Sequence, residues 1–199
     1  MEVKQMRKSL VVIALAITLV ATGAAFAGIP SASTSTVERE GQGIANCNPD
    51  ITVVCPASDF GSVLVTVTVR NVYGDPLPDK IVDCYPNVVS GTFCFCPGED
   101  SKQDTTDANG QVFFTFSDFG GCGDLEFGAE CEGVIFNASP TIYIASFDNN
   151  GDCTIGLPDF INFANVYGTA DACSDYNCDG TVGLSDFISF ANHYGHSCP

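Results

Sequence analysis

The sequence predicts a multidomain protein in which an all-β sandwich is followed by a small all-α unit. Residues 46–145 show short apolar stretches separated by turn residues, and residues 148–195 contain an internal repeat. The chain has 199 residues, of which 45% are hydrophobic. That length suits one or two domains, and that composition excludes disorder across the whole chain.

The N-terminal 27 residues have the features of a secretory signal peptide. Three basic residues precede an apolar stretch at residues 10–20, and residues 25–27 read Ala-Phe-Ala. An apolar stretch of about 11 residues is too short to cross about 30 Å of hydrocarbon, which disfavours the alternative of a membrane anchor. We therefore expect secretion to the extracellular space or the cell surface. Residues 28–45, rich in Ser, Thr and Gly, are expected to form a flexible N-terminal segment.

Residues 46–145 are expected to form the sandwich. Valines at positions 63, 65, 67 and 69 alternate with other residue types, as in a strand that is buried on one face. Turn residues follow at 71–76 and recur at 106–110. Further strands are predicted at residues 81–85, 112–116, 125–131, 134–136 and 141–144.

The C-terminal segment, residues 146–199, contains a duplication. Residues 148–168 match residues 175–195 at 14 of 21 positions when the sequence is shifted by 27. Each copy reads Asp-x-Asn-x-Asp and has a further Asp at the twelfth position, which is the spacing of an EF-hand-type calcium loop. The side chains at positions 1, 3, 5 and 12, and the backbone carbonyl at position 7, would supply hard oxygen ligands. The predicted ligands of two Ca²⁺ ions are Asp148, Asn150, Asp152, Thr154 and Asp159, and Asp175, Asn177, Asp179, Thr181 and Asp186.

The charge distribution supports a bound cation. The chain carries 24 acidic and 7 basic side chains, a formal net charge of −17, which disfavours binding to nucleic acid. Residues 148–199 contain seven aspartates and no Lys or Arg. Because these charges repel one another, we expect the segment to need a bound cation for a compact fold.

Each predicted loop leads into a predicted helix. Apolar residues recur at helical spacing from Phe160 to Tyr167 and again from Phe187 to Tyr194. Position 6 of the second loop is Gly180, whereas the first loop has Cys153, which must accept a left-handed conformation. This difference predicts that loop one is the weaker site.

Residues 148–195 resemble a dockerin, a tandem calcium-loop module of secreted proteins. The resemblance implies attachment to a cohesin-like protein or cell-surface scaffold. Loop positions 10 and 11, which are often Ser/Thr in that family, are Leu157-Pro158 and Leu184-Ser185 here. The preceding part resembles an invasin-type bacterial immunoglobulin-like domain, through residues 63–69, 71–76 and 106–110. The predicted fold class is therefore an immunoglobulin-like all-β sandwich followed by a dockerin-like module.

The 11 cysteines predict disulfides formed in an oxidising compartment. Seven lie in residues 46–145 and four in residues 146–199. The four allow three pairings among themselves, and the odd seventh is free or joins the other unit or another chain. A zinc site is the alternative, built on Cys94 and Cys96 or on His193 and His196, but the spacing of the two cysteines is too short for the usual zinc knuckle.

No catalytic residues are predicted. After residue 27 the chain has only two histidines, no nucleophile elbow and no phosphate-binding loop, and the acids outside the repeat are scattered. The leading interpretation is a secreted, non-catalytic protein that binds calcium and attaches to a partner protein through its C-terminal module. The alternative is a calcium-stabilised adhesin or carbohydrate-binding accessory protein linked to polysaccharide degradation.

Overall fold

The structure is a computed structural model that describes residues 28–42, 50–57 and 60–199. The predicted signal peptide, residues 1–27, lies outside the described residues. Within the described residues, neither helix has the length and apolar character of a membrane span.

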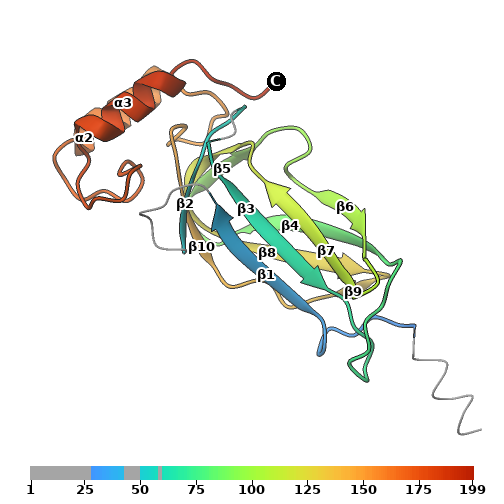
Figure 1. The fold of residues 1–199 in the computed structure, drawn as a ribbon. Coiled ribbons are helices and arrows are strands. Elements are labelled where there is room, and N and C mark those ends of the chain that lie inside the picture. Colours follow the sequence, from blue (N-terminus) through green and yellow to red (C-terminus); the bar gives the residue numbers. More distant parts are fainter. Residues whose placement is uncertain (1–27, 43–49, 58–59) are drawn as a thin grey trace, which may run out of the picture.

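A three-stranded antiparallel sheet forms one layer of the fold (Figure 1). Its strands are β1 (Thr36–Gln42), β3 (Ser62–Thr68) and β7 (Gln111–Phe116), with β3 in the centre. The predicted alternation of β3 is confirmed, because Val63, Val65 and Val67 are buried while the residues between them are partly exposed. The β-branched valines form the inner face of this sheet.

The second layer is a larger sheet with the strand order β2-β10-β8-β4-β6. The strands β2 and β10 pair in parallel, and the other pairs are antiparallel. Two short strands, β5 and β9, also pair with the long strand β8. The bounds are β2 Ile51–Val54, β4 Ile81–Val88, β5 Thr92–Phe95, β6 Lys102–Thr105, β8 Phe119–Cys131, β9 Val134–Ile135 and β10 Ile142–Ser146.

The inner faces of the two sheets share one hydrophobic core. Val65 and Phe116 from the first sheet and Val82, Phe127 and Ile144 from the second are fully buried in it. Phe116 and Phe127 are in contact across the layers, with ring centroids 4.9 Å apart. The β-rich part of the chain is thus compatible with an immunoglobulin-like sandwich.

Several strands differ from the sequence-based expectation. Residues 28–45 were expected to be flexible, but β1 lies within this segment and pairs with β3 along its length, from Thr36 with Thr68 to Gln42 with Ser62. The strands β2, β5 and β6 were not predicted. The strand β8 begins at Phe119 instead of residue 125. Its first part was missed because residues 120, 121 and 123 are glycines, which interrupt the apolar pattern by which a strand is recognised.

Two helices, α2 (Leu157–Val166) and α3 (Leu184–His193), lie side by side at one end of the sandwich (Figure 1). They share a second core with the sandwich. Val53 and Phe147, at the ends of neighbouring strands, pack in one cluster with Phe163 of α2 and Phe190 of α3. Because one core contains residues of both parts, the helices are built onto the sandwich.

Disulfides connect the same two parts of the chain. Each of the bonds Cys94–Cys153, Cys96–Cys198 and Cys122–Cys173 joins the sandwich to the C-terminal segment, with Cys94 in β5, Cys96 directly after it and Cys122 in β8. The four cysteines of the C-terminal segment were expected to form disulfides among themselves. That expectation was wrong, because three of them are bonded to cysteines of the sandwich. These bonds fit an oxidising environment outside the cytoplasm.

The predicted fold class, a sandwich followed by a separate all-α module, is wrong for the same reasons. The described chain is a single β-rich domain that carries two short helices. The repeat predicts the helices locally, but the shared core and the disulfides place them on the sandwich.

Candidate metal-binding loops on the sandwich

Loop one, residues 148–159, is separated from the end of β10 by one residue and wraps around the side chain of Asp148. The backbone N–H groups of Gly151 and Asp152 donate to Oδ1 of Asp148, at 2.9 and 3.1 Å, and that of Cys153 donates to Oδ2 at 2.9 Å. These three bonds curl the loop around a carboxylate that is fully buried. The first predicted ligand is thus held by the backbone of its own loop.

The last residue of loop one closes the ring from the start of α2. The carboxylate of Asp159 accepts hydrogen bonds from the N–H of Asn150 at 3.1 Å and of Gly156 at 2.8 Å. Carboxylate oxygens of Asp148, Asp152 and Asp159 lie within 4.8 Å of one another. The structure therefore brings together three of the side chains that the sequence placed in the first site.

The other two predicted residues of loop one lie next to Asp152. The side-chain amide of Asn150 donates to Oδ2 of Asp152 at 2.9 Å, and the N–H of Thr154 donates to Oδ1 of the same residue at 3.0 Å. The two carboxylate oxygens of Asp152 are thus oriented by the positions that precede and follow it.

Loop two, residues 175–186, repeats this network. Asp175 accepts from the N–H groups of Asp179 and Gly180, and Asp186 accepts from those of Asn177 and Gly183. The amide of Asn177 donates to Asp179, and the N–H of Thr181 donates to the same carboxylate. All the predicted ligands of loop two therefore occupy positions equivalent to those of loop one.

Both loops need left-handed backbone at positions 4 and 6. The φ angles are 67° at Gly151 and 71° at Cys153 in loop one, and 55° at Cys178 and 90° at Gly180 in loop two. The expected left-handed conformation of Cys153 is confirmed. The sequence reasoning overlooked Cys178, and because each loop holds one cysteine in this conformation, backbone strain does not distinguish the two sites.

Packing against the sandwich distinguishes loop one from loop two. A Cβ atom on Gly120 of β8 would lie 2.6 Å from Cγ of Asp148, so only glycine allows this close approach. The N–H of Gly121 also donates to the carbonyl oxygen of Asp148 at 2.6 Å. Together with the bond between Cys94 and Cys153, these contacts anchor loop one to β5 and β8.

The electrostatics of the loops fit a cation. Asp148, Asp159 and Asp186 are fully buried, and burial raises the pKa of Asp148 to about 6 and raises that of Asp159. The ion pairs recorded among the described residues lie in the sandwich, and residues 148–199 contain no Lys or Arg. Buried carboxylates that lack a cationic partner are costly, and a divalent ion with a preference for oxygen ligands would neutralise them.

The two repeats are joined by reciprocal backbone pairing. Ile155 of loop one exchanges hydrogen bonds with Gly195 and His196 after α3, whereas Val182 of loop two exchanges them with Gly168 and Thr169 after α2. The backbone groups of Ile155 and Val182 are therefore not hydrogen-bonded to each other. Each loop instead holds the end of the other repeat's helix.

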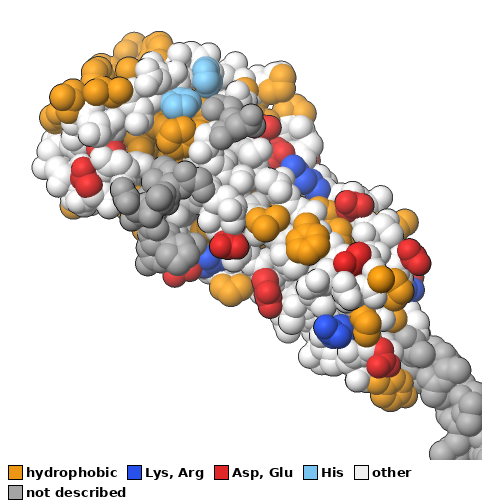
Figure 2. Space-filling model, in the orientation of Figure 1, with side chains coloured by type: hydrophobic (Ala, Val, Ile, Leu, Met, Phe, Trp, Pro, Cys, Tyr) orange, Lys and Arg blue, Asp and Glu red, His pale blue; other side chains and the backbone are white. Residues whose placement is uncertain are grey.

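Hydrophobic side chains gather over the helices at this end of the molecule (Figure 2). The side chains of Phe163 and Phe190 are buried in the core that the helices share with the sandwich. Four pairs of residues, each related by the 27-residue shift, are exposed by 38–64%. We call this set the helix face: Leu157, Phe160, Ile161 and Tyr167 of repeat one and Leu184, Phe187, Ile188 and Tyr194 of repeat two.

The cysteines and histidines considered for zinc have other partners. Cys94 and Cys96 are in disulfides. The ring of His193 stacks on Phe147 at 4.3 Å and lies next to that of His196 at 5.5 Å. Packing and disulfides thus account for these side chains.

No family model, curated protein or solved structure matches the chain. Since no family model matches and no separate all-α module is present in the described residues, the identification of a dockerin preceded by an invasin-type domain is wrong. Two loop–helix repeats are present, but they are parts of a β-rich domain.

Proposed function

We propose that this protein is a secreted, non-catalytic calcium-binding protein that attaches to a partner protein through the helix face. One ion is assigned to each loop, with the ligands named from the sequence. The disulfides support an extracellular location.

The observation that carries the calcium proposal is the burial of carboxylates for which the described residues supply no cationic partner. Three aspartates are fully buried, and three carboxylates of loop one converge within 4.8 Å. Their backbone hydrogen bonds orient the oxygens, so the loops need little rearrangement to bind an ion. Bound calcium would supply the missing positive charge and hold the start of each helix.

The helix face supports the attachment part of the proposal. Eight large apolar side chains are exposed on the two short helices and at the residue that follows each of them. Exposed apolar patches of this kind mark interaction surfaces. The expected partner is a protein with a complementary apolar patch, since the side chains of the helix face are all apolar.

Isothermal titration calorimetry on the full-length secreted chain tests the calcium proposal. We expect two Ca²⁺ ions per chain and a melting temperature that falls when EDTA is added, because the ligand stabilises only the folded state. Asp152→Ala and Asp179→Ala should each remove about one ion. Asp104→Ala, an exposed aspartate on β6, is the control and should leave two. Absence of saturable binding in the unsubstituted protein would refute the assignment.

Affinity capture from the extracellular proteins of the source organism tests the attachment. Ile161→Lys combined with Ile188→Lys should abolish capture, because two charges enter the centre of the helix face. Val88→Lys, at a 50% exposed valine of β4, is the matched control and should retain capture. Capture that survives the double substitution would show that another surface binds the partner.

A further inference from the structure

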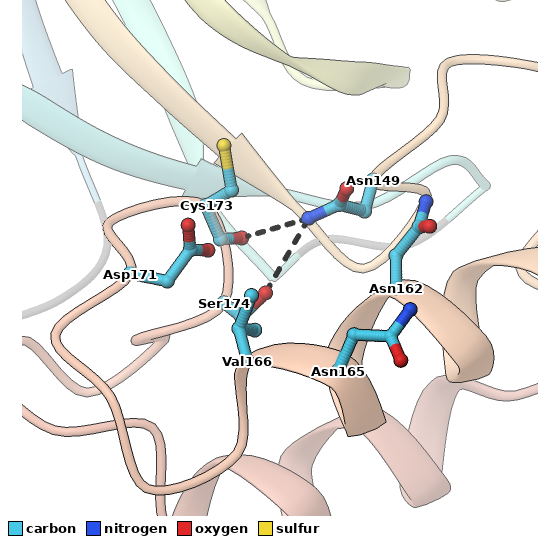
Figure 3. A pocket seen from close by; sticks show the side chains of 7 residues that line it. All are labelled: Asn149, Asn162, Asn165, Val166, Asp171, Cys173 and Ser174. Carbon is cyan, nitrogen blue, oxygen red and sulfur yellow. Dashed lines mark hydrogen bonds between the residues drawn. The ribbon is translucent and has the colours of Figure 1, made fainter.

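A polar cavity of about 340 Å³ lies between loop one, α2 and the turn that precedes loop two (Figure 3). The carboxamides of Asn149, Asn162 and Asn165 surround it, together with the carboxylate of Asp171 and the hydroxyl of Ser174. None of these side chains is among the predicted calcium ligands. The cavity is therefore a feature beside loop one that the calcium proposal leaves without a role.

One wall of the cavity is held rigidly. The amide of Asn149 donates to the carbonyl oxygen of Cys173 at 3.5 Å and to Oγ of Ser174 at 3.4 Å, as Figure 3 shows. Ser174 is 1% exposed, and Cys173 is linked by a disulfide to Cys122 of β8. These bonds leave the carbonyl oxygen of Asn149 available as an acceptor.

The internal repeat provides a comparison for this cavity. The 27-residue shift relates Asn149 to Tyr176 and Val166 to His193, and it relates Ser174 to Phe147. At the position that the repeat relates to the cavity, the rings of Tyr176 and His193 both pack on Phe147, with centroids 4.4 and 4.3 Å from that of Phe147. An aromatic cluster thus fills one side of the duplicated unit, whereas small and polar residues leave the other side open.

The chemistry of the lining selects among ligands. A carboxamide carries both donors and acceptors, so three of them can bind hydroxyl groups that act in either direction. Neighbouring hydroxyls of a sugar ring suit the paired atoms of an amide or a carboxylate. The lining has one negative charge and no positive charge, which disfavours anions.

We propose that this cavity binds a neutral sugar unit, through Asn149, Asn162, Asn165 and Asp171. The volume is sufficient for one hexose ring and falls in the range of small-molecule sites. Val166 supplies an apolar surface beside the amides. The cavity is a site distinct from the helix face, and sugar binding there does not depend on the attachment of a partner protein.

The test is an NMR titration of the ¹⁵N-labelled full-length secreted chain, saturated with calcium, with glucose, galactose and N-acetylglucosamine in turn. At least one sugar should cause saturable shifts in the amide signals of Asn149, Asn162, Asn165 and Ser174. Asn162→Ala combined with Asn165→Ala should weaken that binding by at least about tenfold, because several hydrogen bonds are lost.

The repeat supplies the matched control. Asn192 corresponds to Asn165 on α3 and is exposed, so Asn192→Ala should bind the sugar as tightly as the unsubstituted chain. Calcium titration of all variants should still give the unsubstituted stoichiometry, which separates the sugar site from the loops. No saturable shifts with any of the three sugars, or an equal loss in Asn192→Ala, would overturn the proposal.

Discussion

The contact between Gly120 and Asp148 provides a sharp test of how loop one depends on the sandwich. In Gly120→Ala, the added Cβ would lie 2.6 Å from Cγ and 2.7 Å from Cβ of Asp148, and closer still to Oδ2. Ordinary carbon contacts are about 3.5 Å or longer, so the overlap is close to 1 Å. Because Cβ of Asp148 is itself involved, rotation of the side chain cannot relieve the clash.

The backbone must therefore move, although the hydrogen bond from Gly121 to the carbonyl oxygen of Asp148 holds it in place. Overpacking of this kind costs about 1–3 kcal/mol of stability. The effect on calcium should be larger, because coordination distances tolerate only about 0.2 Å of displacement. We expect the stoichiometry to fall from two ions to one, with loop two unaffected.

Calorimetry with Ca²⁺ measures the number of ions that Gly120→Ala binds. The control is Gly156→Ala in the same loop, where the nearest atom to the new Cβ is Cδ of Pro158 at an ordinary 3.5 Å. This variant should still bind two ions. If Gly120→Ala also bound two ions with unchanged affinity, Asp148 would not be a ligand held in place by β8.

Two further predictions concern the cores. Phe147→Ala should destabilise the protein by about 3–5 kcal/mol, since the ring is fully buried between β10 and the helices. Sheets and helices should still melt in one transition by circular dichroism, and two separate transitions would contradict a single domain; Phe113→Ala, at a 55% exposed ring, should cost far less. Burial raises the pKa of Cys84 from 9.0 to about 12 and that of Cys131 from 9.0 to about 11. The folded state favours the neutral thiols, so their stabilisation is complete below pH 9 and is lost as the pH rises toward 11–12. Iodoacetamide at pH 8 should leave both unmodified in the folded protein and alkylate them after unfolding in urea, as read by mass spectrometry of the peptides; rapid modification of Cys84 in the folded state would refute its burial.

Local patterns in the sequence predicted part of the local structure, although β1, β2, β5 and β6 were missed. The alternation of Val63, Val65 and Val67 predicts a strand because successive side chains of a strand point to opposite faces. The twelve-residue spacing of the aspartates predicts that the carboxylates of loop one converge, and the hydrogen bonds that form this loop join residues at most nine positions apart. The helices that follow are predicted by the same local periodicity.

The sequence left undetermined whether the repeats form a module of their own, and only the tertiary structure decided this. The duplication resembles an independent unit, but Phe147 and Val53 complete its core from the ends of two strands. The bond from Cys96 to Cys198 spans 102 positions of the chain. Cysteine spacing carries no information about such pairs, because their distance is set by the packing of distant segments. The amide-lined cavity has the same origin, since Asn149, Asn162 and Ser174 come together only when loop one, α2 and the turn before loop two are packed.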